Sequence, residues 1–204
     1  TATGAGSCQV SWVSSNDTSR LRMMMSDRTA PAMANPSNSW NRTKNGASMI
    51  LGLQAYDSNV VFGSGEGGLI YRTNNGGSSW VSNNIGTGGW IFDVEPEPGN
   101  NNRWVAVGGD GFVASTANGV TSLPGAATWT DHSAALIAAG WPAAEDVDGV
   151  AVITASTWMV AGDKGWVGRT TTSGASWTVY QLANGDMVDI DAVSTTEYVA
   201  VTSW

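Results

Sequence analysis

The chain has 204 residues and a net charge of −8, with 9 Lys and Arg against 17 Asp and Glu. This charge argues against a nucleic-acid partner or an anionic membrane surface. An apolar share of 42% excludes a disordered tail, and 26 Gly with 13% charged residues is atypical of long helices. The single cysteine cannot form an internal disulfide, and no run of about 18 apolar residues predicts membrane insertion.

One strand motif recurs along the chain with a mean period of about 44 residues. The copies read MMMS, VVFG, VAVG, MVAG and VAVT, and they end at Ser26, Gly63, Gly108, Gly162 and Thr202. A tryptophan follows four of these copies at a similar distance, at Trp40, Trp80, Trp129 and Trp177. Because two independent markers keep the same phase, the sequence indicates a repeat architecture.

Each period divides into four short runs, which in the clearest period read MILGLQAY, VVFG, LIYRT and SSWVS. Val, Ile, Tyr and Trp fill the runs, while Gly, Asn, Asp and Ser fill the breaks, as is typical of strands and turns. Four strands in about 40 to 50 residues are typical of one blade of a β-propeller. The predicted fold is therefore all-β, a β-propeller of four-stranded antiparallel blades.

The periods predict a single domain, 1–204, with about four and a half blades. Their approximate bounds are 8–43, 48–83, 90–132, 147–181 and a partial blade at 187–204. A propeller closes by pairing its last blade with its first, and an open end exposes an unpaired strand edge. We therefore expect the chain to be part of a larger propeller or to complete its ring with strands of another chain. A four-bladed ring with the last two strands packed elsewhere is the alternative.

The segment VVFGSGEGGLIYRTNNGGSSW resembles the Asp-box, or BNR, repeat of sialidase-type and photosystem II assembly-factor propellers. The residues that match the family hairpin are Thr73, Asn75, Gly77, Ser79 and Trp80. A second copy keeps Thr170, Gly174, Ser176 and Trp177. That copy has Thr172 where the family has Asp or Asn, and an insertion containing LPGAA breaks the copy at Trp129. The resemblance implies that the box stabilises the hairpin and that its Trp packs between neighbouring sheets.

Sialidase chemistry would require converging arginines, a tyrosine nucleophile activated by a glutamate, and an aspartate acid. Arg72 and Arg169 occupy the same repeat position, directly before the box Thr, which favours a scaffold role. Glu197 and Tyr198 are adjacent, and neighbours on a strand point to opposite faces. We therefore expect no enzymatic activity.

The insertion after Trp129 predicts a short helix with Ser133 as its N-cap, which runs through Ala139 and stops at Gly140. Its apolar residues Leu136, Ile137 and Trp141 should dock on a neighbouring blade or a partner. The single histidine, His132, is expected to be a solvated loop residue.

Acidic residues recur on the first strands of two periods, where Asp93 and Glu95 align with Asp189 and Asp191. Residues two apart share a strand face, and first strands line the central channel of a propeller. These four side chains could form an acidic channel mouth that holds Ca²⁺ or another hard cation. Alternatively, they are solvated carboxylates that contribute to solubility. No other cofactor is predicted.

The preferred function is a noncatalytic structural or interaction module with protein partners, in particular a bacteriophage virion or tail protein. Richness in Thr, Ser, Asn and Gly, scarce Lys and the lack of disulfides favour this version, with a virion or extracellular location. A glycan-binding or sialidase-like protein is the alternative, with stacking platforms at Trp90, Trp141 and Trp166. A photosystem assembly factor ranks lower, because the chain is acidic.

Overall fold

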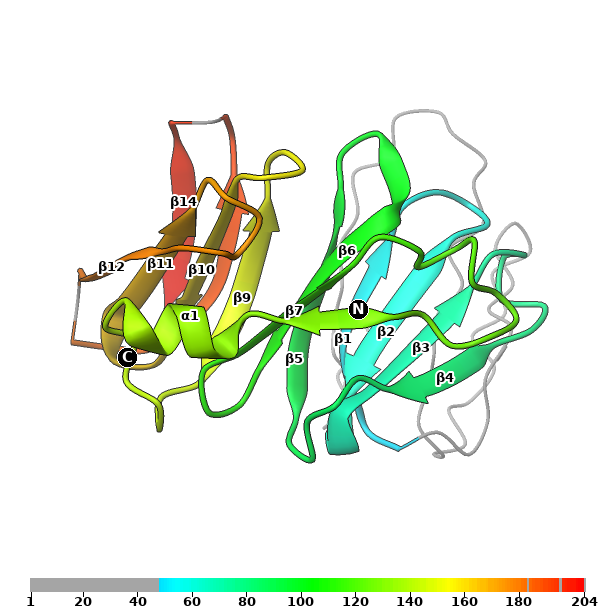
Figure 1. The fold of residues 1–204 in the computed structure, drawn as a ribbon, viewed down its shortest axis with the longest axis horizontal. Helices are drawn as coiled ribbons and strands as arrows, with labels where there is room; N and C mark the ends of the chain where they lie inside the picture. The colour runs from blue at the N-terminus through cyan, green and yellow to red at the C-terminus, as the bar shows by residue number, and fades with distance from the viewer. Residues whose placement is uncertain (1–47, 183, 195, 204) are drawn as a thin grey trace, which may run out of the picture.

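The computed structural model of the chain describes residues 48–182, 184–194 and 196–203. The predicted blade at 8–43, and with it any pairing of that blade with the last strands, lies outside the described residues. The described part is all-β, with antiparallel sheets whose strands follow one another in chain order (Figure 1). The predicted fold class, a propeller of four-stranded blades, is confirmed.

Three described sheets have four strands and one has two. The first sheet contains β1 (Ile50–Ala55), β2 (Val61–Gly65), β3 (Leu69–Thr73) and β4 (Val81–Asn84). The second contains β5 (Ile91–Glu97), β6 (Asn100–Gly108), β7 (Phe112–Thr116) and β8 (Trp129–Asp131). The third contains β9 (Val147–Val152), β10 (Trp158–Gly162), β11 (Trp166–Thr170) and β12 (Thr178–Gln181). The half sheet contains β13 (Met187–Ala192) and β14 (Tyr198–Thr202).

Short helical segments interrupt this pattern. Two 3₁₀ turns, η1 (Glu66–Gly68) and η2 (Asp163–Gly165), join the second and third strands of their sheets, and α1 (Ser133–Ala138) follows β8. No helix in the described part of the chain has the length and apolar character needed to span a membrane.

The first strands of successive sheets lie side by side, with β1 against β5, β5 against β9, and β9 against β13 (Figure 1). We call these four the inner strands. Side chains between successive sheets form the core, because each sheet has apolar residues on both faces. Phe62 of the first sheet stacks on Trp104 of the second, with ring centroids 3.8 Å apart. Val105 and Val107 of the second sheet pack in the same way with Val150 of the third.

A β-bulge occurs at the same position of every inner strand. The register shifts between Ile50 and Gly52, and equivalent shifts recur in β5, β9 and β13. The first residues of the inner strands pair with Gly65, Gly108, Gly162 and Thr202. The sequence alignment had placed Gly63 in this set, two residues too early. Since side chains alternate with a period of two, this error shifted the register without exchanging the two faces.

A side chain at the repeated glycine would collide with the main chain. A Cβ on Gly108 would lie 2.0 Å from the carbonyl oxygen of Trp90, and Gly162 has the same relation to Asp146. This close approach explains why glycine recurs at the end of the second strand in three sheets.

The half sheet packs on the third sheet through Met187 and Ile190. Its other face carries Val199 and Val201, which are 57% and 55% exposed. By strand register these two residues correspond to Val105 and Val107, which are fully buried between the second and third sheets.

The insertion after β8 packs between the second and third sheets. Leu136 and Trp141 belong to the core cluster shared by these sheets, as expected of docking residues. The helix differs slightly from the prediction, because its N-cap is His132 and it ends at Ala138. Ser133 instead accepts a hydrogen bond from the Val113 amide through its hydroxyl, 3.1 Å away.

Candidate functional site

The hairpin after β3 shows how the box residues act. The Thr73 hydroxyl accepts a hydrogen bond from the Gly77 amide at 3.0 Å and donates one to Asn75 Oδ1 at 2.9 Å. Asn75 Oδ1 also accepts from the Ser79 amide at 2.9 Å. These bonds satisfy turn amides that would otherwise lack partners, which is a structural role. Trp80 next to them is half-buried.

The copy after β11 has the same geometry despite its substitution. Thr172 Oγ1 accepts from the Ser176 amide at 2.9 Å, as Asn75 Oδ1 accepts from Ser79. Thr170 accepts from the Gly174 amide at 3.1 Å. Trp177 is buried, and its indole N–H donates to the Gly174 carbonyl at 3.1 Å. A hydroxyl therefore replaces the amide oxygen of the box without loss of the turn.

A third hairpin keeps the box across the insertion. Thr116 Oγ1 donates to Asn118 Oδ1 at 2.8 Å, and Asn118 Oδ1 accepts from the Thr128 amide at 2.9 Å. Residues 119–127 separate the two halves of the motif, where the box after β3 has only residues 76–78, and Thr128 directly precedes Trp129. Sequence reasoning recognised the insertion but missed these residues, although the split pattern Thr-x-Asn and Thr-Trp was readable.

Arg72 and Arg169 each reach toward the following sheet. The Arg72 guanidinium is buried and donates to the Gly119 carbonyl, to Ser122 Oγ at 2.8 Å and to the Gly125 carbonyl at 2.7 Å. Burial lowers the pKa of Arg72 from its ordinary value. Arg169 Nε donates to the Tyr198 hydroxyl at 3.4 Å. The two arginines therefore bridge different pairs of sheets and do not converge on one anion site.

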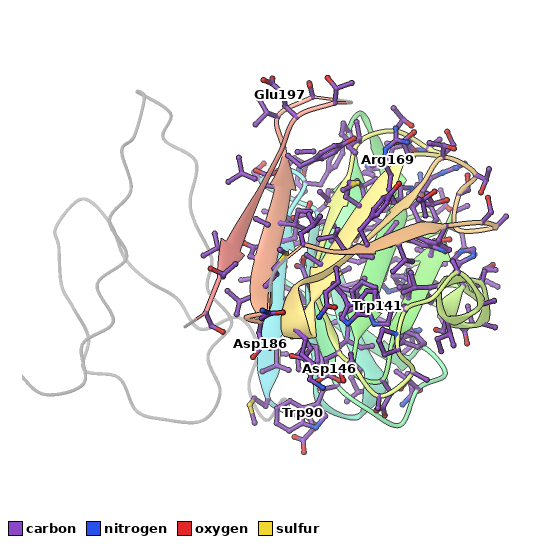
Figure 2. The ribbon with its side chains drawn as sticks, turned by 90° about the vertical axis from the view of Figure 1, so that its left-hand side faces the viewer. Trp90, Trp141, Asp146, Arg169, Asp186 and Glu197 are labelled. Atoms are coloured by element: carbon purple, nitrogen blue, oxygen red, sulfur yellow. The ribbon has the colours of Figure 1, made fainter. Side chains whose placement is uncertain are left out.

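Acidic residues at the amino ends of the inner strands also support the scaffold. Asp146 Oδ1 accepts from the Asp110 amide at 2.9 Å, and Asp186 Oδ1 accepts from the Lys164 amide at 2.9 Å. Asp110 and Lys164 have φ of 58° and 53° in the tight turns of the preceding sheets. Figure 2 shows Asp146, Asp186 and Trp90 at one end of the sheets, with Arg169 and Glu197 toward the other.

The predicted channel residues occupy equivalent positions on β5 and β13. Asp93 pairs with Val107 and Asp189 pairs with Val201 in the two registers. Asp93 is partly buried and accepts hydrogen bonds from the Val94 amide at 2.8 Å and from the Val150 amide at 3.0 Å. Burial raises the pKa of Asp93 to about 6 against the opposing effect of these amides. Asp93 therefore joins the second sheet to the third.

Glu95 has a different environment. Gln54 Nε2 of β1 donates to Glu95 Oε2 at 3.2 Å. Burial and the charges of Asp93, Asp191 and Asp189 together raise the pKa of Glu95 to about 8. A carboxyl with this pKa is mostly protonated at pH 7.

A pocket of about 410 Å³ lies at the carboxyl ends of the inner strands. We call it the end pocket. Its polar wall includes Gln54, Glu95 and Asp191, and its apolar wall includes Pro96, Pro98, Ile153 and Val193. The structure thus brings two of the four predicted channel residues to one pocket. Within residues 48–203 as described, no three His, Cys, Asp or Glu side chains are arranged to hold a metal ion.

The three predicted stacking tryptophans do not form one surface. Trp90 is 42% exposed, with the ring of Phe92 6.4 Å away. Trp166 is half-buried against the core shared by the second and third sheets. Trp141 is only 1% exposed, and its indole N–H donates to the Glu145 carbonyl at 3.0 Å. The prediction of Trp141 as a stacking platform is wrong, because the insertion folds its ring into the core.

His132 is likewise not a solvated loop residue. Its ring packs edge-on against Trp158, with centroids 5.4 Å apart, and its Nε2 lies 2.9 Å from Ser115 Oγ. Burial lowers the pKa of His132, while the charge of Asp131 opposes that shift. The prediction failed because the third sheet covers this loop.

Searches with the whole sequence find no matching family and no matching curated protein. Solved β-propeller structures are similar. One described as YCF48 bound to D1 peptide has a TM-score of 0.58 and 20% identity, over 76% of this chain and 48% of that chain. The Cps50 (Swd1) β-propeller domain of Myceliophteria thermophila has a TM-score of 0.60 and 10% identity, over 82% and 53%.

A third structure, U3-55K, has a TM-score of 0.62 and 9% identity, over 78% of this chain and 47% of that chain. The chain thus spans about half the length of these solved proteins. At such identities the similarity shows the fold alone, and the Asp-box assignment stays a prediction based on the hairpin residues. What the comparisons show for this chain is the β-propeller fold.

Proposed function

We propose that this chain is a noncatalytic β-propeller that acts as an interaction module and binds a protein partner. The observation that carries the proposal is the end pocket, which combines carboxyl groups with an apolar wall. The size of the pocket falls within the range of about 300–1,000 Å³ that is usual for ligand sites. Conspicuous polar residues elsewhere, including Thr73, Arg72 and Asp146, form hydrogen bonds that hold turns and sheets together.

The similar structure of YCF48 with D1 peptide supports a peptide-binding role, since it is a propeller that holds a peptide. The preferred biological version remains a bacteriophage virion or tail protein. The scarcity of lysine and the Ser, Thr, Asn and Gly richness support it. Mass spectrometry of purified virions from the source should then detect the chain at a fixed copy number per particle. Its absence from washed particles would remove the virion version.

The interaction function is tested by selecting random dodecapeptides displayed on phage against the immobilised chain. We expect a family of related peptides to be enriched and to bind in calorimetry with Kd values of about 1–100 μM, the range of modest interfaces. A heat-denatured sample of the same chain is the control. Failure to enrich any peptide over that control would overturn the peptide-binding proposal.

A glycan-binding function is the second candidate, supported by the exposed ring of Trp90. Aromatic rings at the surface can stack on the apolar face of a sugar. A glycan array probed with the wild-type chain and with Trp90→Ala tests it, and binding that disappears in the variant would favour it. A photosystem assembly role has less support, because the net charge of −8 contrasts with the basic face expected for such a role.

A further inference from the structure

We propose that the end pocket receives a lysine or arginine side chain from an extended segment of the protein partner. The inference rests on the proposed interaction function and names the chemistry of its partner. The pocket lies where β1, β5, β9 and β13 end, so residues far apart in sequence surround it. Its apolar side can pack on a methylene chain, and its polar side can pair with the charged head of that chain.

The apolar wall fits the stem of a long cationic side chain. Pro96 and Pro98 flank the end of β5, while Ile153 and Val193 follow the ends of β9 and β13. Val193 is 70% exposed, so it offers apolar surface at the rim. A hydrated metal ion would leave such a wall unused.

The polar wall lacks a positive charge from the described part of the chain. By contrast, Glu97 on the same strand is paired with a positive charge, because Arg103 Nε lies 3.1 Å from Glu97 Oε2. Among the described residues, neither Glu95 nor Asp191 forms an ion pair. The partner of Glu95 is the neutral amide of Gln54. A guanidinium or ammonium group from a partner would supply the missing countercharge.

The protonation of Glu95 makes this binding depend on pH. Burial and the charges of Asp93, Asp191 and Asp189 raise the pKa of Glu95 to about 8. A cation in the pocket favours the carboxylate, so binding releases a proton from Glu95. Affinity should therefore rise as the pH increases from 6 to 8 and become constant above the pKa of Glu95.

The experiment uses the dodecapeptides enriched on the full chain. We expect them to share one Lys or Arg position, and norleucine at that position should weaken binding at least about tenfold. Asp191→Asn should also weaken the parent peptide about tenfold, because it removes a carboxylate of the pocket. The matched control is Glu66→Gln, which removes an exposed carboxyl in η1, beside the start of β1 at the opposite end of the sheet. It should change Kd less than about twofold.

The pH dependence is measured with the same peptide by calorimetry. The wild-type Kd should fall at least about fivefold between pH 6 and pH 8, whereas the Kd of Glu95→Gln should stay nearly constant. Glutamine mimics the protonated carboxyl in shape, so this variant is expected to fold.

Enriched peptides without a basic residue, or peptides unaffected by Asp191→Asn, would overturn the proposed pocket chemistry while leaving a peptide-binding module intact. A selection that enriches no peptide would overturn both.

Discussion

Polar groups at the interfaces between the sheets and those in the end pocket differ in how far their bonds are made within the chain. Between the sheets, Arg72 donates to three oxygen atoms of the second sheet's insertion, and Asp93 accepts the Val150 amide of the third sheet. In the end pocket, Glu95 has one amide partner and is surrounded by the charges of three aspartates. Polar groups whose bonds are made within the chain belong to the scaffold. A carboxyl whose pKa is raised by burial and by neighbouring charges, and whose one hydrogen-bond partner is a neutral amide, is instead a candidate for contact with a partner.

The largest expected effect separates scaffold tryptophans from exposed ones. Trp177→Ala should lower the free energy of unfolding by about 3–5 kcal/mol, because it opens a cavity in the core. Trp90→Ala should cost less than about 1 kcal/mol, since its ring is 42% exposed. Chemical denaturation measures both, and Trp80→Ala should fall between them because its ring is half-buried. Equal losses for Trp177 and Trp90 would contradict the blade-packing assignment.

The next effect concerns stability and pH in the end pocket. The folded state holds the proton of Glu95 up to a pKa of about 8, above the ordinary value of 4.5. Wild-type stability should therefore decrease as the pH rises from about 4.5 to 8. Glu95→Gln avoids this loss, so its advantage should be below about 1 kcal/mol at pH 5 and about 2–4 kcal/mol at pH 9. Denaturation at both pH values tests this, and an advantage of equal size at pH 5 and pH 9 would assign the effect to packing.

A smaller effect separates acidic residues at the two ends of the inner strands. Asp146→Ala removes the acceptor of the Asp110 amide and should cost about 1–2 kcal/mol of stability. Asp191→Asn should change stability by less than about 0.5 kcal/mol, because Asp191 is exposed. For peptide affinity the order should be reversed, so that Asp191→Asn weakens binding and Asp146→Ala leaves it nearly unchanged. If Asp146→Ala keeps its fold but loses peptide affinity, the assignment of Asp146 to the scaffold alone would be wrong.

The smallest expected effect is on catalysis. Fluorogenic sialosides and neutral glycosides should show no turnover above buffer, because Arg72 and Arg169 bridge different pairs of sheets. Turnover that co-purifies with the chain and disappears in Tyr198→Phe would contradict the noncatalytic proposal.

The sequence predicted those features that local bonding determines. The box at Thr73 was readable because its partners lie within a few residues, whereas the copy at Asn118 was missed because its partner Thr128 lies ten residues away. His132, and Trp141 as a stacking platform, were misjudged for another reason. Their burial depends on the third sheet, and no local pattern states which sheet covers a loop.

Only part of the candidate site could be predicted from the sequence. Repetition correctly aligned Asp93 and Glu95 with Asp189 and Asp191. It did not distinguish Asp93, which bonds to the neighbouring strand, from Glu95, which faces the pocket. The end pocket itself joins residues from four inner strands, so its shape follows from how the sheets pack side by side.

The exposed face of the half sheet affects how readily its strands unfold locally. Stacked repeats behave approximately as a chain of nearest-neighbour couplings, so a unit held on one side should fluctuate more than a unit held on two. Val199 and Val201 are exposed, whereas their counterparts Val105 and Val107 are sealed between sheets. Amide protons of β14 should accordingly exchange with solvent through local fraying, and those of β6 only through openings that separate whole sheets. Among the described sheets, the half sheet should therefore have the least protected amides.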